Sequence, residues 1–305
     1  MSARAQQEIS LLPAANWVRS FEQRFEHNVQ RHVLLSAYTS FGVGGPATLM
    51  ARASTIHECS QLLHAARQAD VDVLMLEDGQ NTLVGDWGFD GLVVRLDGTF
   101  CRLMPDAGAL SIGAACSVGR VLQACLAARL DASALTPLDG HLGSALLRAD
   151  AAQRQALEAL FERIEFLTAD GLHQSVGLLG DLPEDAWMIT RVVLRAKPAL
   201  DDAGVCDRME ARRLLMQTRR PRHPSLGPVF RLEDGGSAAA AIREVGLAGV
   251  AVGQASIPKR HCDTLVNLGG ATARDALELI DCVGARLAGR LGLNLDLCLR
   301  IVGGF

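Results

Sequence analysis

A loop that could bind an anion lies at residues 76–84, where a glycine and an asparagine precede a short apolar segment. Backbone N–H groups left bare beside a glycine can surround a phosphate group. Gly79, Asn81 and Thr82 are the residues of this loop that could take part. Glu77 and Asp78 place two carboxylates at its mouth, where they repel an anionic ligand. The loop therefore has the frame of a phosphate site and the wrong charge for one.

A second candidate for anion binding is the basic segment 218–224, TRRPRHP. Arginine forms bidentate hydrogen bonds with phosphate, so this segment could face a diphosphate. Its arginines are Arg219, Arg220 and Arg222. A basic run is more often a solvated surface, and the residues alone leave both interpretations open.

The eight cysteines form no CxxC pair and no Cys–His cluster with zinc spacing. We interpret them as small buried hydrophobic residues of a reducing compartment, and this includes Cys298 in spite of the nearby Arg300. The formal net charge of -4 and the pI near 6.1 argue against a nucleic-acid partner. No segment reaches the roughly 18 apolar residues of a membrane span, and the N-terminus lacks a signal core. We therefore expect a cytoplasmic protein without a membrane partner and without a metal site.

These candidates lie among alternating strands and helices, a pattern typical of α/β or α+β domains. Strands are predicted at 71–76, 91–96 and 108–117, and again near 163–171 and 187–200. Thr55, with Glu58 three residues later, predicts a capping box, and Ser237 predicts the start of a helix that stops at Gly246. A last helix carries an apolar stripe made of Leu277, Ile280, Val283, Leu287 and Leu291.

The length of 305 residues suggests about two domains. Charged stretches such as residues 20–33 predict a helical N-terminal extension over 1–35. Pro198 and the polar stretch 198–208 separate two apolar patterns. We therefore predict a first domain at 36–198 and a second at 199–305.

Three segments resemble the motifs of the UDP-N-acetylenolpyruvoylglucosamine reductase (MurB) family. YTSFGVGGPA (38–47) is similar to NTSFxVGGPA, and residues 76–96 are similar to LGGGSNLLVxDxGFxGLVIRL. Residues 246–280 are similar to GLKGxxxGDAxVSxKHAxFIVNxGxATAxDVxxLI, and matches continue in order to residue 303.

The resemblance implies an α+β fold, in which an FAD-binding domain of the vanillyl-alcohol-oxidase (PCMH) type precedes a smaller MurB C-terminal substrate domain. It also implies reduction of UDP-N-acetylenolpyruvoylglucosamine to UDP-N-acetylmuramate in peptidoglycan synthesis, with hydride passing from NADPH through FAD. A UDP-sugar would be the substrate, and the family uses the region of Arg219, Arg220 and Arg222 near it.

Both loops that the resemblance assigns to FAD are altered. In the first, Glu77, Asp78 and Gln80 replace two glycines and a serine. In the second, LDGHLGSA (138–145) corresponds to GIPGTVGGA, and RADAA (148–152) replaces MNAGA. The cofactor-binding positions retained or replaced there are Gly140, His141, Gly143, Ser144 and Ala145. We interpret His141 as a loop histidine in solvent, and we predict weak or absent FAD.

The catalytic set that the resemblance implies is not intact. Pro228 occupies the position of the proton-donating serine, and Cys298 that of the glutamate, which Asp296 precedes. Proline has no proton to give, and a thiol is a poor substitute for a carboxylate. The family's arginine has no counterpart within 176–194.

Three hypotheses remain open. The chain is a family member that has lost reductase activity and has a structural or regulatory role, or it is an active UDP-N-acetylmuramate dehydrogenase with substitute residues that uses NADPH. Alternatively, it binds a nucleotide sugar without redox chemistry. The protein partner and the oligomeric state cannot be predicted from these residues.

Overall fold

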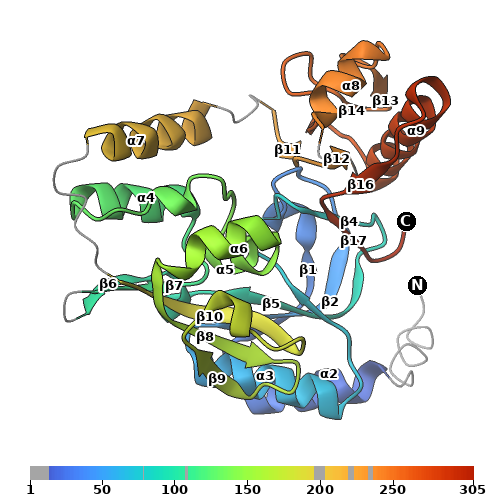
Figure 1. Ribbon diagram of the computed structural model, residues 1–305. Helices are drawn as coiled ribbons and strands as arrows, with labels where there is room; N and C mark the ends of the chain where they lie inside the picture. Colours follow the sequence, from blue (N-terminus) through green and yellow to red (C-terminus); the bar gives the residue numbers. More distant parts are fainter. Residues whose placement is uncertain (1–13, 78, 107–108, 196–202, 219–222, 233–235) are drawn as a thin grey trace, which may run out of the picture. The chain divides into compact units, whose positions relative to one another are not determined.

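The computed structural model describes residues 14–77, 79–106, 109–195, 203–218, 223–232 and 236–305 (Figure 1). The chain divides into two compact units, and neither is one continuous segment. Unit 1 comprises residues 1–51, 72–93 and 221–305, and unit 2 comprises 52–71 and 94–220. The domain boundary that we place at 198–199 lies outside the described residues and stays a prediction.

Unit 1 begins with helix α2 (Ala14–Phe25) and contains a four-stranded sheet of order β1-β2-β5-β3. Its strands are β1 (Val29–Leu34), β2 (Pro46–Ala53), β3 (Val73–Met75) and β5 (Phe89–Leu96). The helix expected over 20–33 is wrong in its second half, because α2 ends at Phe25 and residues 29–34 form β1. The antiparallel ladder that joins Val29 to Ala51 and Leu34 to Pro46 satisfies the backbone of β1, and this tertiary pairing outweighs local helix preference.

The C-terminal part of unit 1 is a mixed set of short strands around two helices. Its helices are α8 (Ala238–Glu244) and α9 (Ala273–Leu291). A second four-stranded sheet has the order β11-β15-β14-β13. The strands are β11 (Ser225–Leu226), β12 (Phe230–Leu232), β13 (Ala251–Val252), β14 (Ala255–Ser256), β15 (Leu265–Asn267), β16 (Leu295–Leu297) and β17 (Arg300–Val302).

Strand β17 pairs in parallel with β4 (Thr82–Val84), which directly follows the first candidate loop. The register joins Arg300 to Thr82 and Val302 to Val84. The backbones then stay so close that a Cβ atom on Gly85 would lie 2.0 Å from the Gly304 carbonyl oxygen. Glycine is therefore required at position 85 by the approach of two backbones.

Unit 2 contains a five-stranded antiparallel sheet of order β6-β7-β10-β8-β9. The strands are β6 (Leu103–Asp106), β7 (Ala109–Gly113), β8 (Phe161–Thr168), β9 (His173–Val176) and β10 (Ala186–Arg195). The helices are α3 (Ile56–Gln68), α4 (Val118–Ala127), α5 (Leu142–Leu147), α6 (Ala151–Glu158) and α7 (Ala203–Thr218). Apolar side chains from β7, β8 and β10 form one core with residues of α4, α5 and α6.

Several local predictions are confirmed. Thr55 caps α3 by accepting from the Glu58 N–H, but the predicted capping box is wrong in its second half, because the Glu58 carboxylate accepts from the N–H of Ser54 and not from that of Thr55. Ser237 caps α8, and Gly246 follows that helix with φ of 76°. In α9 the buried face includes Ile280, Val283 and Leu287. Within the described residues, no helix has the length and apolar character needed to cross a membrane.

Candidate functional site

The first candidate loop is held in unit 1 by a glycine that the fold requires. Gly79 is buried and has φ of 65°. A Cβ atom there would lie 2.6 Å from the Thr39 Cα atom, which is too close for any other residue. The Ser40 hydroxyl lies 3.1 Å from the Gly79 carbonyl oxygen and 2.7 Å from that of Ser225, so it links the loop to β11. The fold therefore explains why Gly79 is present, without any ligand.

The next two residues of the loop connect to the segments that carry the candidate catalytic positions. The Gln80 carbonyl oxygen accepts from the Gly227 N–H at 2.9 Å, and the Asn81 carbonyl oxygen accepts from the Arg300 N–H at 2.8 Å. The Asn81 and Thr82 side chains are half-buried.

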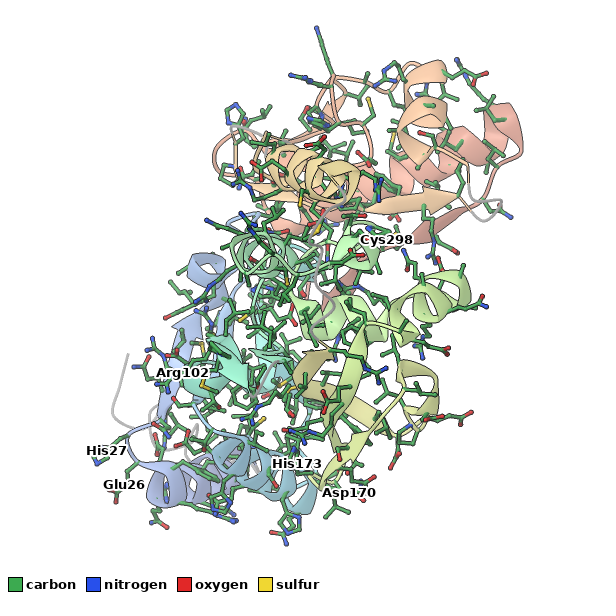
Figure 2. The ribbon with its side chains drawn as sticks, turned by 60° about the vertical axis from the view of Figure 1, so that its left-hand side comes forward. Glu26, His27, Arg102, Asp170, His173 and Cys298 are labelled. Atoms are coloured by element: carbon green, nitrogen blue, oxygen red, sulfur yellow. The ribbon has the colours of Figure 1, made fainter. Side chains whose placement is uncertain are left out.

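Pro228 and Cys298 lie together at this loop. Pro228 is exposed and follows Gly227, while the next residue, Val229, donates its N–H to the Asp263 carbonyl oxygen at 2.7 Å. The Val229 carbonyl oxygen in turn accepts from the Cys298 N–H at 2.8 Å. Cys298, labelled in Figure 2, is half-buried between β16 and β17. The positions that the resemblance pairs are therefore brought together, but with a proline ring and a thiol.

Some predicted positions cannot be placed. Asp78, Arg219, Arg220 and Arg222 lie outside the described residues. Glu77 is described and is half-buried, so one carboxylate lies two residues before Gly79 and partly inside the unit.

The second candidate loop belongs to unit 2. Gly140 has φ of 80°, and its N–H donates to the Asp139 carboxylate at 2.8 Å. His141 forms an isolated β-bridge with Ser117 and is the residue before α5. Our interpretation of His141 as a solvent histidine is wrong, because the residue is half-buried and its Nδ1 atom is buried.

The backbone N–H groups that follow are used within the chain. Leu142 donates to the Cys116 carbonyl oxygen, Gly143 to that of Ala114 and Ala145 to that of His141, each at 2.9 Å. The Ser144 hydroxyl also donates to the His141 carbonyl oxygen, at 3.2 Å. A diphosphate site of this type needs backbone N–H groups that point at the ligand. The residues of this loop therefore do not fit a diphosphate in the described conformation.

Gly143 has a structural role of its own. A Cβ atom there would lie 2.7 Å from the Ala114 Cβ atom, at the contact between α5 and the end of β7. As with Gly79, close packing within the unit explains the glycine.

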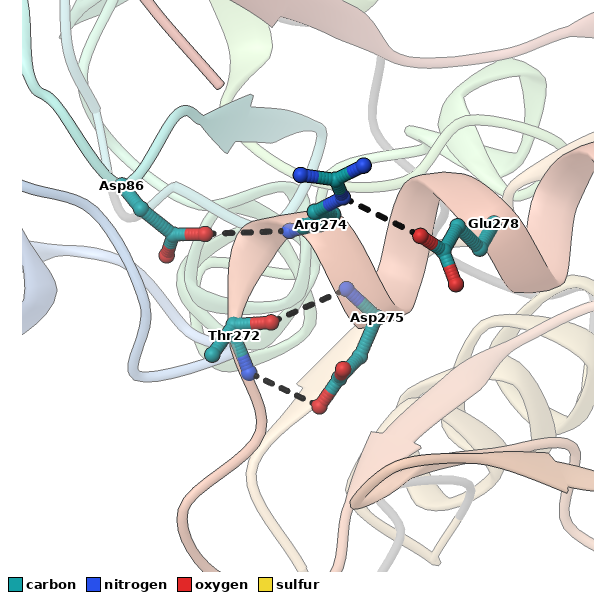
Figure 3. Close-up of polar contacts among 5 residues, drawn as sticks. All are labelled: Asp86, Thr272, Arg274, Asp275 and Glu278. Atoms are coloured by element: carbon teal, nitrogen blue, oxygen red, sulfur yellow. Dashed lines mark hydrogen bonds and ion pairs between the residues drawn. The ribbon is translucent and has the colours of Figure 1, made fainter.

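Sequence reasoning missed the role of Asp86. Its carboxylate accepts from the N–H groups of Ala273 and Arg274, at 2.8 and 3.1 Å, and thereby caps α9 (Figure 3). Thr272 and Asp275 form a capping box at the same helix end. Burial acts to raise the pKa of the Asp275 carboxyl, but the N–H groups of Thr272 and Gln254 outweigh it and lower that pKa overall. Asp86 lies in the motif of residues 76–96, and its role at that position is to cap α9.

Comparison with known proteins agrees with this arrangement. Residues 219–302 match the family model for the C-terminal domain of UDP-N-acetylenolpyruvoylglucosamine reductase. The chain is 32% identical over 306 residues to the UDP-N-acetylenolpyruvoylglucosamine reductase of Anaeromyxobacter sp. (strain Fw109-5), covering 95% of this chain and 94% of that protein. It is 30% identical over 303 residues to UDP-N-acetylenolpyruvoylglucosamine reductase 2 of Symbiobacterium thermophilum, covering 95% and 97%.

Among solved structures, the chain resembles the UDP-N-acetylenolpyruvylglucosamine reductase (MurB) of Thermus caldophilus. The TM-score is 0.70 at 29% identity, and the likeness covers 90% of this chain and 99% of that one. The expected α+β fold of the MurB type, with a MurB C-terminal domain, is thus confirmed. The chain belongs to the UDP-N-acetylenolpyruvoylglucosamine reductase family.

Proposed function

We propose that this chain is a member of the family in which the reductase reaction has been lost or strongly weakened. The observation that carries the proposal is the pair formed by Pro228 and Cys298, which the Val229 backbone joins beside the Gln80–Asn81 loop. In the family, these positions supply a proton donor and a carboxylate to the reduction of an enolpyruvyl UDP-sugar.

The chemistry explains why these replacements matter. Reduction of an enol ether adds a hydride to one carbon and a proton to its neighbour. A positioned acid contributes about 10² to 10⁴ in rate. Proline has no side-chain proton to give. Because the effects of losses within one catalytic set do not add, the first loss already removes most of the rate enhancement.

The FAD-type loops support the same proposal. The second loop donates its Leu142, Gly143 and Ala145 N–H groups internally, and the first carries Glu77 two residues before its glycine. FAD would supply the hydride in an active member, with NADPH as its reductant. Because the residues of the second loop do not fit the cofactor's diphosphate, we assign no reaction step to it here. We propose that FAD binds weakly or not at all.

A second candidate function is binding of a UDP-sugar without redox chemistry. The match to the C-terminal domain spans residues 219–302, and the apolar core of this region is fully formed around α8 and α9. The basic residues Arg219, Arg220 and Arg222 are the proposed partners of the diphosphate. Calorimetric titration with UDP-N-acetylglucosamine tests this binding, and a triple substitution to serine is expected to abolish any heat that is seen.

The reductase proposal is tested by the visible absorbance of the purified protein and by an activity assay. Oxidation of NADPH is followed with the enolpyruvyl UDP-sugar and added FAD, beside the Thermus caldophilus reductase as an active control. We expect no stoichiometric flavin and a rate at least about 10³-fold below the control. Ordinary turnover would show that other residues perform the reaction, and the proposal would be wrong.

A further inference from the structure

Strand β9 is an outer strand of the sheet in unit 2, and its edge lacks the features that usually prevent pairing. It pairs on one side with β8, without a bulge (Figure 1). Natural edge strands are blunted by lysine, proline, inward charges or bulges. Residues 171–178 read GLHQSVGL, with no lysine, arginine, proline or acidic residue. Among the described residues, no further strand pairs with this edge.

The hydrogen bonds of the β8–β9 turn show which backbone groups of β9 face outward. The Thr168 N–H donates to the Leu172 carbonyl oxygen at 3.0 Å, so these two residues form a hydrogen-bonded pair. Bonded and non-bonded pairs alternate along an antiparallel ladder. Gln174 and Val176 therefore face β8, whereas the N–H and C=O groups of His173 and Ser175 point away from the sheet.

The start of the strand is anchored, so the edge is well positioned. Asp170 forms an ion pair with Arg67 of α3, and the Ser60 hydroxyl donates to the Gly171 carbonyl oxygen. The His173 imidazole lies 3.5 Å from the Glu165 carboxylate, on the face of the sheet and not across its edge (Figure 2 labels His173 and Asp170). Glu165 is 8% exposed, so the His173 imidazole that contacts it lies close to the sheet.

We propose that β9 pairs antiparallel with β9 of a second copy of this chain, about a two-fold axis at Gln174. His173 of one copy then lies opposite Ser175 of the other. The two symmetric pairs use all the outward N–H and C=O groups of these residues in four hydrogen bonds. The result is one continuous sheet across the two copies.

The side chains of this strand match their own symmetric copies. Leu172 is 59% exposed and would lie opposite Val176 of the second copy. Val176 already packs against the core of unit 2, so the added leucine extends an apolar layer. Gln174 meets its own copy, where the two carboxamides can hydrogen-bond. Like charges directly opposite each other destabilise a strand pair, and this segment contains no aspartate, glutamate, lysine or arginine. This self-match favours a second copy over an unrelated strand.

The interface is short, so the dimer should be weak. Interfaces below about 1,000 Å² support transient rather than obligate association. Sedimentation velocity over about a hundredfold range of protein concentration should therefore show a monomer–dimer equilibrium. Hydrogen exchange gives a second measurement, because protection of the His173 amide should rise with concentration.

Ser175→Pro is the sharpest variant. Proline is tolerated on an edge strand where the N–H faces solvent, so the fold should be kept. The substitution removes the Ser175 N–H from each copy, hence two of the four hydrogen bonds, and should abolish the dimer. Ser175→Ala keeps the N–H group and should still dimerise. Trp87→Ser removes another exposed apolar side chain, 80% exposed in unit 1, and should leave the equilibrium unchanged.

Leu172→Lys provides a test that does not depend on proline, since it brings a charge opposite Val176 of the second copy and should also give a monomer. A wild-type protein that stays monomeric at every concentration would overturn the proposal. It would equally be overturned by a dimer that survives both Ser175→Pro and Leu172→Lys.

Discussion

The Cys298 N–H donates to the carbonyl oxygen of Val229 at 2.8 Å, and this bond fixes the thiol-bearing segment beside Pro228. Two positions seventy residues apart in sequence are therefore joined by a hydrogen bond of the backbone. Since the side chains do not make this contact, it survives their replacement. The backbone arrangement of this candidate site can thus be kept while its side chains change.

Restoring both side chains should not restore the reaction. Pro228→Ser with Cys298→Glu returns a hydroxyl and a carboxylate, but the loop of Gly140–Ala145 would still donate its N–H groups internally. We expect NADPH oxidation with the enolpyruvyl UDP-sugar to stay at least about 10³-fold below that of an active relative. Thermal unfolding of the double variant serves as the control for its folding. A rate within about tenfold of the relative would show that the flavin loops are competent.

Gly79→Ala should destabilise unit 1. The new Cβ atom would lie 2.6 Å from the Thr39 Cα atom, and the residue would keep φ of 65°. Strain of this kind costs about 1–3 kcal/mol. Urea denaturation measures the loss of unfolding free energy. Gly284→Ala is the matched control: it lies in α9 with open space around it and should be neutral or stabilising, as alanine favours a helix over glycine.

Asp86→Ala should lower the unfolding free energy by about 1 kcal/mol, because the Ala273 and Arg274 N–H groups at the start of α9 lose their acceptor. Asp86→Asn keeps an acceptor oxygen and should lose less. Asp281→Ala removes an exposed carboxylate from the middle of the same helix and controls for the change in charge. Equal effects of Asp86→Ala and Asp281→Ala would contradict the capping role.

Burial raises the pKa of the Cys59 and Cys125 thiols to about 12, from an ordinary value of 9.0. Between these values the unfolded chain releases protons that the folded chain retains. The free energy of unfolding should therefore fall as the pH rises above 9, by about 1 kcal/mol per thiol near pH 10. Urea denaturation at about pH 8 and about pH 10 measures this fall. In Cys59→Ala the fall should be smaller by the contribution of one thiol, and an unchanged fall would disprove the assignment.

The elements with strong local signals could be predicted from the sequence. Thr55 and Ser237 each begin a helix because their hydroxyls accept from the N–H three residues later, and this depends on neighbours alone. Strand β1 could not be predicted, because its partner β2 decides its conformation.

The sequence could predict which residues belong to the candidate site, but not the contacts between them. Pro228 and Cys298 could be named from motifs, but the Val229 bond between them depends on long-range pairing. The same is true of Asp86, whose partners Ala273 and Arg274 lie far along the chain. The buried Nδ1 atom of His141 could not be predicted either, because no local sequence pattern marks this residue as buried.

The parallel pairing of β4 with β17 has a consequence for the order in which the protein folds during synthesis. Both segments of unit 2 emerge from the ribosome before residue 221, so this unit can fold while translation continues. Unit 1 must wait, because Thr82 meets its partner Arg300 only after roughly two hundred more residues have been made. Until then β4 has no β17 beside it, and the nascent chain carries an incomplete first unit attached to a finished second one.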